Sequence, residues 1–542
     1  MSFKGTLLPY QVDAVDKMVS KKKLLVAYEM GLGKTCMTIA AVEVLKDEQK
    51  ITQPVLVVCL SSLKYQWQKE IQKFSDSNAV VIDGSKSTRS IRWSREMEWE
   101  NHTGYVICNY ETLVADWDLI KDYEWGAIVI DEATAIKGFK SQRSKVVKKI
   151  AKTIPVRFAL TGTPIENGRP EELFSIMQFV DDTLLGRFDL FDQTFIVRNH
   201  FGGVQRYRNI PIFHEKMKGA SVRKTQKDPD VAPYLPETIH LDPIQVPLDP
   251  KAADLYRKIS SDLMQELNDA KELLGTGFSL EAHYGQGHKP GSPADALRGS
   301  IMSKITSLRM LCDSPLLLVE SSTKFNNGWQ DLDGDKVNIL GSRGGSAYVA
   351  GLAEAGLLDG LNKSPKLDSV VNYVMDHLNI DESHKVVIFS SYLGVLPLLE
   401  AAFTKKKIKV STYSGEMNSS QKEDSKVLFQ TSKEVRVLIS SDAGGYGVDL
   451  PQANLLVNYD LPWSAGAATQ RNSRIRRASS TWSHVVIQDF LVVGSIEERQ
   501  FEMLNQKNAV ADAVMDGHGI NLNGGIDLTV GSLLNFLQDT GI

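Results

Sequence analysis

Short runs of hydrophobic residues, many of them β-branched, recur along the chain, and each is followed by a longer segment whose hydrophobic positions have helical spacing. Uninterrupted hydrophobic runs are typical of strands buried on both faces, as in a parallel sheet covered by helices. The pattern predicts such strands at residues 24–28, 55–60, 105–109, 127–130 and 157–160, and again at residues 386–389, 435–439, 455–459 and 485–490. We therefore expect an α/β protein with two parallel-sheet lobes.

The stretch between the two groups of strands lacks this pattern. It is expected to be mainly helical at residues 171–225 and 249–274. Segments rich in Gly, Pro, His, Asn or Asp predict loops at residues 275–300 and 321–364. A last helix is predicted near residues 532–537. The expected domains are lobe 1 at 1–240 with a helical insertion at about 171–235, an insertion and linker at 241–365, lobe 2 at 366–505 and a C-terminal tail at 506–542.

The composition fits several folded domains in a reducing compartment. The chain has 542 residues, 62 Lys and Arg against 66 Asp and Glu, a net charge of −4 and 42% hydrophobic residues. At about 100–200 residues per domain, the length excludes a small disulfide-stapled scaffold. The four cysteines form no CxxC pair and indicate neither a disulfide framework nor a cysteine zinc site. No hydrophobic run approaches the roughly 20 residues of a membrane span, so we expect a cytoplasmic protein.

The most informative segment follows the first predicted strand and precedes a predicted helix. It contains Gly31, Gly33, Lys34 and Thr35. Glycines let backbone N–H groups surround phosphate oxygens, a lysine at this position reaches the β- and γ-phosphates, and the threonine hydroxyl can bind magnesium. The common pattern GxxxxGK[ST] would need glycine at Tyr28, so the pattern fails by one residue.

Two further groups of charged residues complement this phosphate loop. Asp131 and Glu132 end the predicted strand 127–130 and could hold magnesium and orient an attacking water, although two solvated acids at a strand end are the simpler interpretation of this segment alone. In the second lobe, Arg474 and Arg477 are three residues apart and would share one face of a helix. A solvated basic face is the alternative to an arginine that reaches a γ-phosphate across a cleft.

In this order the motifs resemble those of SWI/SNF-type DNA translocases of helicase superfamily two, and among them a compact bacterial or phage member. Residues 29–35 match the family's phosphate loop letter for letter, and that family does not keep the first glycine. Residues 8–11, 160–164 and 441–450 match further family motifs. The sequence departs from the family pattern at four positions, namely Thr134 for His, Lys422 for Arg, Ser473 for Asp and Arg476 for His.

The resemblance implies two RecA-like lobes with helical insertions, and a monomer that uses ATP and magnesium to translocate along double-stranded DNA. It implies catalytic roles for Lys34, Asp131, Glu132, Gln470, Arg474 and Arg477. It implies nucleotide contacts from Gln11, Met30, Gly31, Leu32, Gly33, Lys34, Thr35, Gly447 and Asp449, and magnesium contacts from Thr35 and Asp131. It implies nucleic-acid contacts from Ser61, Lys64, Lys137, Thr161, Ser390 and Gly444.

Because phosphate contacts do not depend on sequence, the DNA-facing surface is expected to be basic although the chain is not. Seven basic residues between 137 and 152 are one candidate for this surface, with a solvated helix as the equal alternative. Two other functions remain open at this stage. One is a strand-separating DNA helicase, and the other is an ATP-gated clamp or scaffold on DNA.

Overall fold

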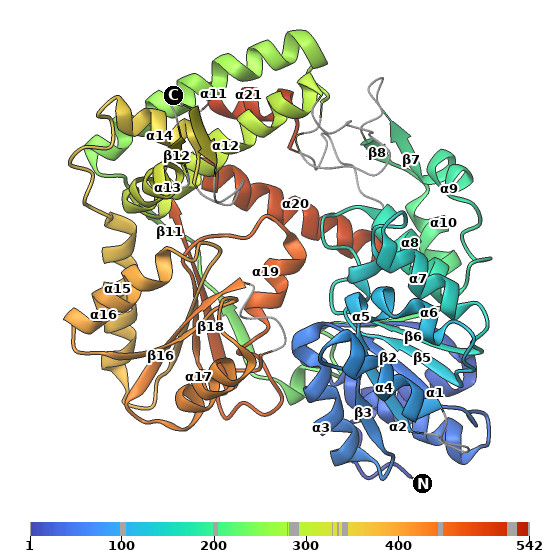
Figure 1. Cartoon of the computed structure of the whole chain (residues 1–542). Helices are drawn as coiled ribbons and strands as arrows, with labels where there is room; N and C mark the ends of the chain where they lie inside the picture. The colour runs from blue at the N-terminus through green and yellow to red at the C-terminus, as the bar shows by residue number, and fades with distance from the viewer. Residues whose placement is uncertain are drawn as a thin grey trace.

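The computed structural model describes residues 2–97, 104–198, 204–278, 280, 292–327, 329–332, 335–338, 345–442, 448–516 and 528–539. Two parallel sheets with helices on both faces form two lobes, and a layer of helices extends beyond the second lobe (Figure 1). The predicted α/β class with two parallel-sheet lobes is therefore confirmed.

The first lobe contains a seven-stranded sheet in the order β3-β4-β2-β5-β6-β1-β9. Its strands are β1 (Lys23–Tyr28), β2 (Val55–Cys59), β3 (Ala79–Val81), β4 (Tyr105–Asn109), β5 (Ala127–Ile130), β6 (Val156–Leu160) and β9 (Ser221–Lys224). Its helices are α1 (Pro9–Lys21), α2 (Lys34–Asp47), α3 (Lys64–Phe74), α4 (Lys86–Met97), α5 (Tyr110–Ala115), α6 (Trp117–Ile120), α7 (Gln142–Ala151), α8 (Pro170–Val180), α9 (Phe188–Phe195) and α10 (Ile210–Met217). Alternate residues of the central strands point into one of two hydrophobic cores, one on each face of the sheet.

The second lobe repeats this architecture with its own sheet, in the order β10-β18-β17-β14-β16-β15, and β11 also pairs with β18. Its strands are β10 (Glu237–His240), β11 (Ile244–Val246), β14 (Val386–Ser390), β15 (Lys409–Tyr413), β16 (Val435–Ser441), β17 (Leu455–Asn458) and β18 (His484–Val492). Its helices are α15 (Pro365–Ile380), α16 (Val395–Lys405), α17 (Ser419–Thr431) and α19 (Ala465–Asn472). Both faces of this sheet are again buried.

The helical layer has a separate hydrophobic core. It consists of α11 (Pro250–Leu274), α12 (Pro293–Asp313), α13 (Pro315–Asn327), α14 (Ala347–Glu354) and α21 (Val530–Asp539). Among the described residues, two short hairpins lie outside the large sheets: β7 (Ile196–Arg198) with β8 (Val204–Tyr207), which packs against a core of the first lobe, and β12 (Trp329–Leu332) with β13 (Asp335–Asn338), which follows α13.

Helix α20 (Ile496–Asp516) runs from the helical layer beside the second lobe to the first lobe (Figure 1). Near its start, Ile496 and Met503 lie in the core of the helical layer. Near its end, Val510 and Val514 belong to a core of the first lobe. At about 1.5 Å per residue, its 21 residues span roughly 30 Å. One helix therefore joins the second lobe to the first.

The structure confirms all nine predicted strands, each to within two residues at either end. The expectation of a mainly helical segment at 171–225 is wrong for the β7–β8 hairpin and for β9, which joins the first sheet next to β1. The two predicted loops are wrong where α12 begins at Pro293, where α13 continues to Asn327 and where α14 forms. Ser292 caps α12, since its side chain accepts a hydrogen bond from Asp295 N, and Pro293 suits the first helical turn.

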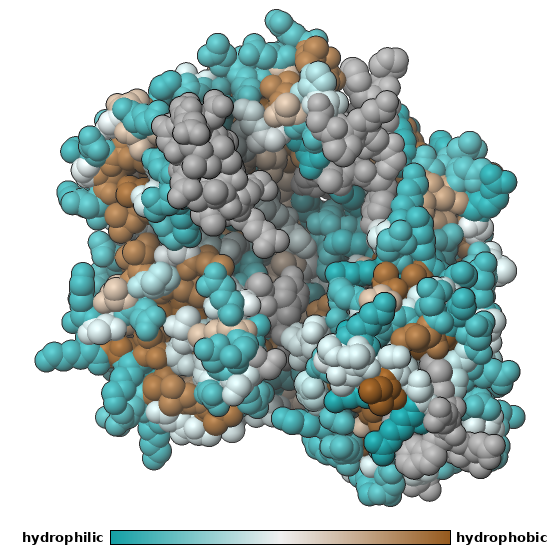
Figure 2. Space-filling model, in the orientation of Figure 1, coloured by the Kyte–Doolittle hydropathy of each residue, from teal (hydrophilic) through white to brown (hydrophobic). Residues whose placement is uncertain are grey.

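The expected domain limits differ from the sheets at two places. β10 lies before residue 240, yet it pairs with β18 of the second sheet. The expected tail at 506–542 contains the end of α20 and α21, and α21 packs on α11 in the helical layer. On the face shown in Figure 2, hydrophobic residues form several separate patches on a mainly hydrophilic surface.

Candidate active site

The phosphate loop connects β1 to α2 at the carboxyl end of the first sheet. Gly31 and Gly33 have φ of 83° and 85°, a left-handed conformation that glycine adopts without a steric penalty. Gly33 is also the N-cap of α2, so the unpaired N–H groups of the first helical turn face the loop. Backbone N–H groups and the positive end of the helix together make a site for an anion.

The Lys34 ammonium lies inside this loop. Its Nζ donates hydrogen bonds to the carbonyl oxygens of Tyr28 at 2.8 Å and Glu29 at 3.3 Å. Burial lowers the pKa of Lys34, while the nearby carboxylates of Glu132 and Asp131 act in the opposite direction. The side chain is therefore held where an added negative charge would stabilise its protonated form.

Gln11 covers the loop from α1. Its Nε2 donates to the Leu32 carbonyl oxygen at 3.0 Å, and its Oε1 accepts from Leu8 N at 2.9 Å. A Cβ atom at Gly33 would overlap Gln11 Nε2, so glycine is required there both for its φ and for space. The predicted nucleotide residues of α1 and of the loop thus lie together.

The acidic pair follows β5 and faces Lys34. Asp131 accepts hydrogen bonds from Trp67 Nε1 at 2.8 Å and from Glu132 N at 2.9 Å. Glu132 has a φ of 48°, which is uncommon outside glycine and aims its side chain away from the strand. Its Oε2 is buried and has no hydrogen-bond partner among the described residues. Burial raises the pKa of both carboxyl groups, and their mutual repulsion adds to this effect for Glu132.

The predicted arginines approach from the second lobe. α19 ends at Asn472, so Arg474 and Arg477 lie in the turn after the helix and do not share a helical face. Arg477 Nε donates to Asp449 Oδ1 at 2.5 Å, and its Nη1 would lie 2.8 Å from a Cβ atom at Gly31. Arg474 is buried and near enough to Glu132 to lower the pKa of that carboxyl group, against the larger effect of burial.

Two of the residues that depart from the family pattern also contact the first lobe or the segment after it. Ser473 Oγ donates to Met30 Sδ at 3.2 Å. Arg476 donates to the carbonyl oxygens of Pro236 at 3.0 Å and Gln226 at 3.1 Å. At these two positions, contacts with the first lobe and with the segment after it therefore take the place of the hydrogen bonds expected from Asp and His.

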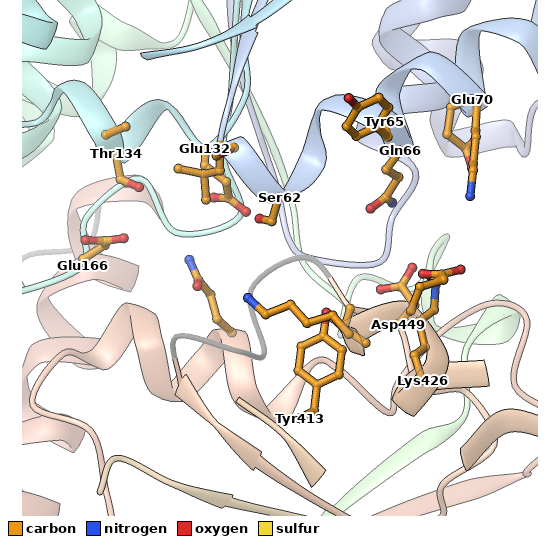
Figure 3. A pocket seen from close by; sticks show the side chains of 18 of the residues that line it. Ser62, Tyr65, Gln66, Glu70, Glu132, Thr134, Glu166, Tyr413, Lys426 and Asp449 are labelled. Carbon is orange, nitrogen blue, oxygen red and sulfur yellow. The ribbon is translucent and has the colours of Figure 1, made fainter. Parts of the chain in front are cut away.

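A cleft of about 1480 Å³ runs between the lobes beside this site. Figure 3 shows Ser62, Glu132 and Thr134 on the first-lobe wall, opposite Tyr413 and Lys426. Among the residues that line it, five are basic, namely Lys69, Lys137, Arg143, Lys422 and Lys426. Five are acidic, namely Glu70, Glu132, Glu166, Glu423 and Asp449. The part of the lining that the structure describes is thus mixed in charge.

Comparison with known families identifies both lobes. The model of the SNF2-related domain matches residues 10–315, and the model of the helicase conserved C-terminal domain matches residues 366–479. The first match alone covers more than half of the chain. The chain belongs to the SNF2-related family.

Individual relatives of this SNF2-related chain are distant and longer. YwqA of Bacillus subtilis is 24% identical over 95% of this chain and 49% of its own length. The ISWI chromatin-remodeling complex ATPase ISW1 of Saccharomyces cerevisiae is 26% identical over 93% of this chain and 40% of its own length. The uncharacterized ATP-dependent helicase MG018 of Mycoplasma genitalium is 26% identical over 89% and 39%. The chain spans about half or less of the length of these relatives.

The helicase domain of Pyrococcus furiosus Hef has a similar fold. It is 16% identical, with a TM-score of 0.50 over 91% of this chain and 97% of that chain. In the part of the chain that the structure describes, no helix is long and apolar enough to cross a membrane.

The predicted nucleic-acid residues of the SNF2-related chain do not all reach the cleft. Ser61 and Lys137 line it. The Lys64 side chain is only 4% exposed and pairs with Asp83 at 3.1 Å. Thr161 and Ser390 are buried. Gly444, like the predicted nucleotide residue Gly447, lies outside the described residues.

The basic residues between 137 and 152 are also dispersed. Arg143 pairs with Glu111, and Lys149 lies over the Trp117 ring at 4.9 Å. Lys148 donates to Ser175 Oγ at 2.8 Å and Gln178 Oε1 at 2.9 Å, and burial lowers its pKa to about 7. Arg143, Lys148 and Lys149 are thus each engaged in a contact within the first lobe.

Several residues that line the cleft were not singled out in the sequence. They include Tyr65, Gln66, Lys69, Glu166, Tyr413 and Lys426. Tyr65 and Lys69 are four residues apart on α3, a spacing that indicates one shared face once the helix is recognised. Gln66 lies on the same helix, whereas Glu166, Tyr413 and Lys426 come from separate elements, and their sequence positions carry no comparable signal.

Proposed function

We propose that this chain is a monomeric ATPase that couples hydrolysis to translocation along double-stranded DNA. The observation that carries the proposal is the position of Arg477 of the second lobe against Gly31 of the phosphate loop. The family match supports it, as does the chain's similarity to the chromatin-remodeling ATPase ISW1 and to the ATP-dependent helicase MG018. ATP between the two lobes would make their relative position depend on its γ-phosphate.

The residues present fit ATP as the substrate. A Cβ atom would lie 2.8 Å from Arg477 Nη1 at Gly31 and would overlap Gln11 Nε2 at Gly33, so both positions require glycine, and the φ values that only glycine adopts readily suit a loop whose backbone N–H groups surround phosphate oxygens. Gln11 stands where the family reads adenine, close to the rings of Tyr10 and Tyr28. The buried, unpartnered Oε2 of Glu132 faces the same region and could orient the attacking water.

The residues also fit magnesium as the cofactor, held by Thr35 and Asp131. In the described part of the chain, no group of three or more His, Cys, Asp or Glu side chains could hold a metal ion. Magnesium is commonly bound by one or two carboxylates together with substrate phosphates, and Asp131 beside a bound nucleotide would supply such a set. When bound, it would neutralise charge on the phosphates.

The chain's own groups would act as follows. Lys34 would exchange its hydrogen bonds to Tyr28 and Glu29 for phosphate oxygens, and the added negative charge would raise the pKa of its ammonium. Glu132 would position water for in-line attack. Arg474 and Arg477 would stabilise charge on the transferred phosphoryl group from the second lobe, so hydrolysis would require the lobes to be together.

We place the DNA in the cleft, with Ser61 and Lys137 on one wall and Lys422 and Lys426 on the other. Contacts to the phosphate backbone hold DNA without reading its sequence, as translocation requires. The five acidic residues of the lining limit how strongly the cleft attracts a polyanion, so binding is expected to be salt-sensitive and moderate.

Turnover of ATP measured in parallel with double-stranded DNA, single-stranded DNA and RNA tests the proposed activity. The matched blank is Lys34→Ala, which removes the phosphate-binding ammonium. We expect the largest stimulation by double-stranded DNA and none in the variant. Equal stimulation by RNA would refute the assigned substrate, and turnover that Lys34→Ala leaves intact would refute the assigned site.

A further inference from the structure

An ion pair lies where the cleft, the acidic pair and the second lobe meet. Lys137 Nζ pairs with a carboxylate oxygen of Glu166, and the two side chains are 32% and 16% exposed in the cleft wall. The main chain of Glu166 is fixed, because its N–H donates to the buried carboxylate of Glu172 at 2.8 Å. The Glu166 side chain therefore extends into the cleft from a rigid loop.

The same residue contacts the second lobe. Gly466, the second residue of α19, donates its N–H to the Glu166 carbonyl oxygen at 3.1 Å. A Cβ atom at Gly466 would lie 2.7 Å from Glu166 Cγ and 3.2 Å from its Cα, so the two lobes touch closely here. Gln470 follows Gly466 by one helical turn and lies on the same face of α19. Its Oε1 is buried, and within the described part of the chain it has no hydrogen-bond partner.

Glu166 is also within electrostatic reach of Glu132. Burial and the neighbouring Asp131 are the larger reasons why the pKa of Glu132 is raised, and the Glu166 carboxylate adds to them. Figure 3 shows Glu132, Thr134 and Glu166 on one side of the cleft. Glu166 is thus placed between a predicted DNA contact, a predicted catalytic carboxylate and the helix that carries Gln470.

We propose that Glu166 is a positioning residue that holds Lys137 until a DNA phosphate takes its place, and that this exchange transmits DNA binding to α19. The inference rests on the proposed function, since it requires DNA in the cleft. Carboxylate and phosphate compete for one ammonium because both accept its charge-assisted hydrogen bonds. Once a phosphate binds Lys137, the Glu166 carboxylate loses that partner, and the Glu166 side chain, whose Cγ lies against Gly466, can shift. The contact between Glu166 and α19 then changes, and with it the position of Gln470 relative to Glu132.

A double-mutant cycle on duplex-DNA affinity tests the competition. Glu166→Gln and Lys137→Gln each remove one charge and keep a side chain of similar shape. At one fixed salt concentration, we expect Glu166→Gln to bind duplex DNA about two- to five-fold more tightly, the size of one partly exposed ion pair. In the Lys137→Gln background the same change should leave affinity unaltered. Glu434→Gln, which removes an exposed acid paired with Lys409 outside the cleft, is the control and should alter neither affinity nor turnover.

Turnover tests the transmission to α19. Glu166→Gln should raise ATP turnover without DNA and lower the factor by which DNA stimulates it. Gly466→Ala changes no charge, but its Cβ atom would displace the Glu166 side chain. It should therefore reduce the stimulation of ATP turnover by DNA, while the affinity for duplex DNA stays within two-fold of the unaltered chain. Circular dichroism spectra verify that each variant is folded.

Different outcomes would overturn the proposed role of Glu166 and the proposed function of the chain. An equal gain in affinity from Glu166→Gln with and without Lys137 would show a general charge effect and overturn the competition. Unchanged stimulation in both Glu166→Gln and Gly466→Ala would overturn the transmission to α19. An unaltered chain that binds no duplex DNA would refute the proposed function itself, and this inference with it.

Discussion

Lys366 lies at the junction of three elements, and its replacement should destabilise the second lobe strongly. The side chain is 1% exposed and pairs with Asp313 of α12 at 2.9 Å and with Glu497 of α20 at 2.6 Å. Tyr459 Oη donates to the Asp313 carbonyl oxygen at 2.5 Å, and Lys366 Nζ lies 5.2 Å from the centre of its ring. Burial raises the pKa of Asp313, and the two acids raise the pKa of Lys366. The Lys366 ammonium therefore offsets the free-energy cost of burying the two carboxylates.

Lys366→Met leaves Asp313 and Glu497 buried without their cation, which costs about 3–5 kcal/mol in comparable pairs. For a unit of 150–250 residues, 1 kcal/mol shifts the melting temperature by about 2–4 °C, so the shift should be roughly 6–20 °C. Differential scanning calorimetry of the whole chain measures this shift in melting temperature.

The triple change Lys366→Met, Asp313→Asn and Glu497→Gln is the matched control. It removes the unpaired charges and should recover a large part of the loss. A shift below 2 °C in Lys366→Met would refute the argument, because it would show that the two carboxylates do not depend on the lysine. A triple variant no more stable than Lys366→Met would show that packing and not charge causes the loss.

Three further predictions follow from the site, from α7 and from α20. Arg477→Ala should lower DNA-stimulated ATP turnover by about 10³-fold or more, as for other arginines that stabilise a transferring phosphoryl group, and unchanged turnover would remove Arg477 from the site. Because the pKa of Lys148 is lowered to about 7, the unfolded state binds one more proton between pH 7 and pH 10, so the free energy of unfolding should rise with pH over that range. Lys148→Met should abolish that rise, and an identical slope in denaturant titrations would contradict the assignment. Arg223 of β9 pairs with Asp512 at 2.6 Å and Asp516 at 3.2 Å near the end of α20, so Arg223→Ala should broaden the distribution of inter-lobe distances in single-molecule fluorescence transfer, with populations shifting up to about five-fold. A distribution identical to that of the unaltered chain would mean that these pairs do not restrain the lobes.

The strands that the sequence predicts are mostly runs of hydrophobic residues buried on both faces of a sheet, interrupted by a few polar residues such as Arg157, Asn458 and Gln488. β9 and β10 escape this reasoning because they lie at sheet edges, where Arg223, Lys224 and Glu237 face polar surroundings. Ser292 and Pro293 are typical of a helix N-terminus and could have predicted the start of α12. The glycine-rich sequence before them led us to predict a loop instead.

The candidate active site likewise has residues that the sequence predicts and residues that it does not. The phosphate loop and the acidic pair are each a contiguous segment, and neighbouring residues alone indicate their chemistry. Lys34 and Glu132 could therefore be singled out from the sequence. Lys64 could not be recognised as a buried partner of Asp83, because that pairing depends on how α3 packs. Glu166 and Tyr413 enter the cleft through the arrangement of two lobes, which no local pattern encodes.

Displacement of the third strand from a triplex on double-stranded DNA tests most directly whether the chain translocates. With ATP we expect displacement by the unaltered chain, none by Lys34→Ala and no unwinding of a forked duplex. Unwinding of the fork would establish a strand-separating helicase instead. ATP-dependent binding to duplex DNA with neither displacement nor unwinding would contradict translocation and indicate a clamp.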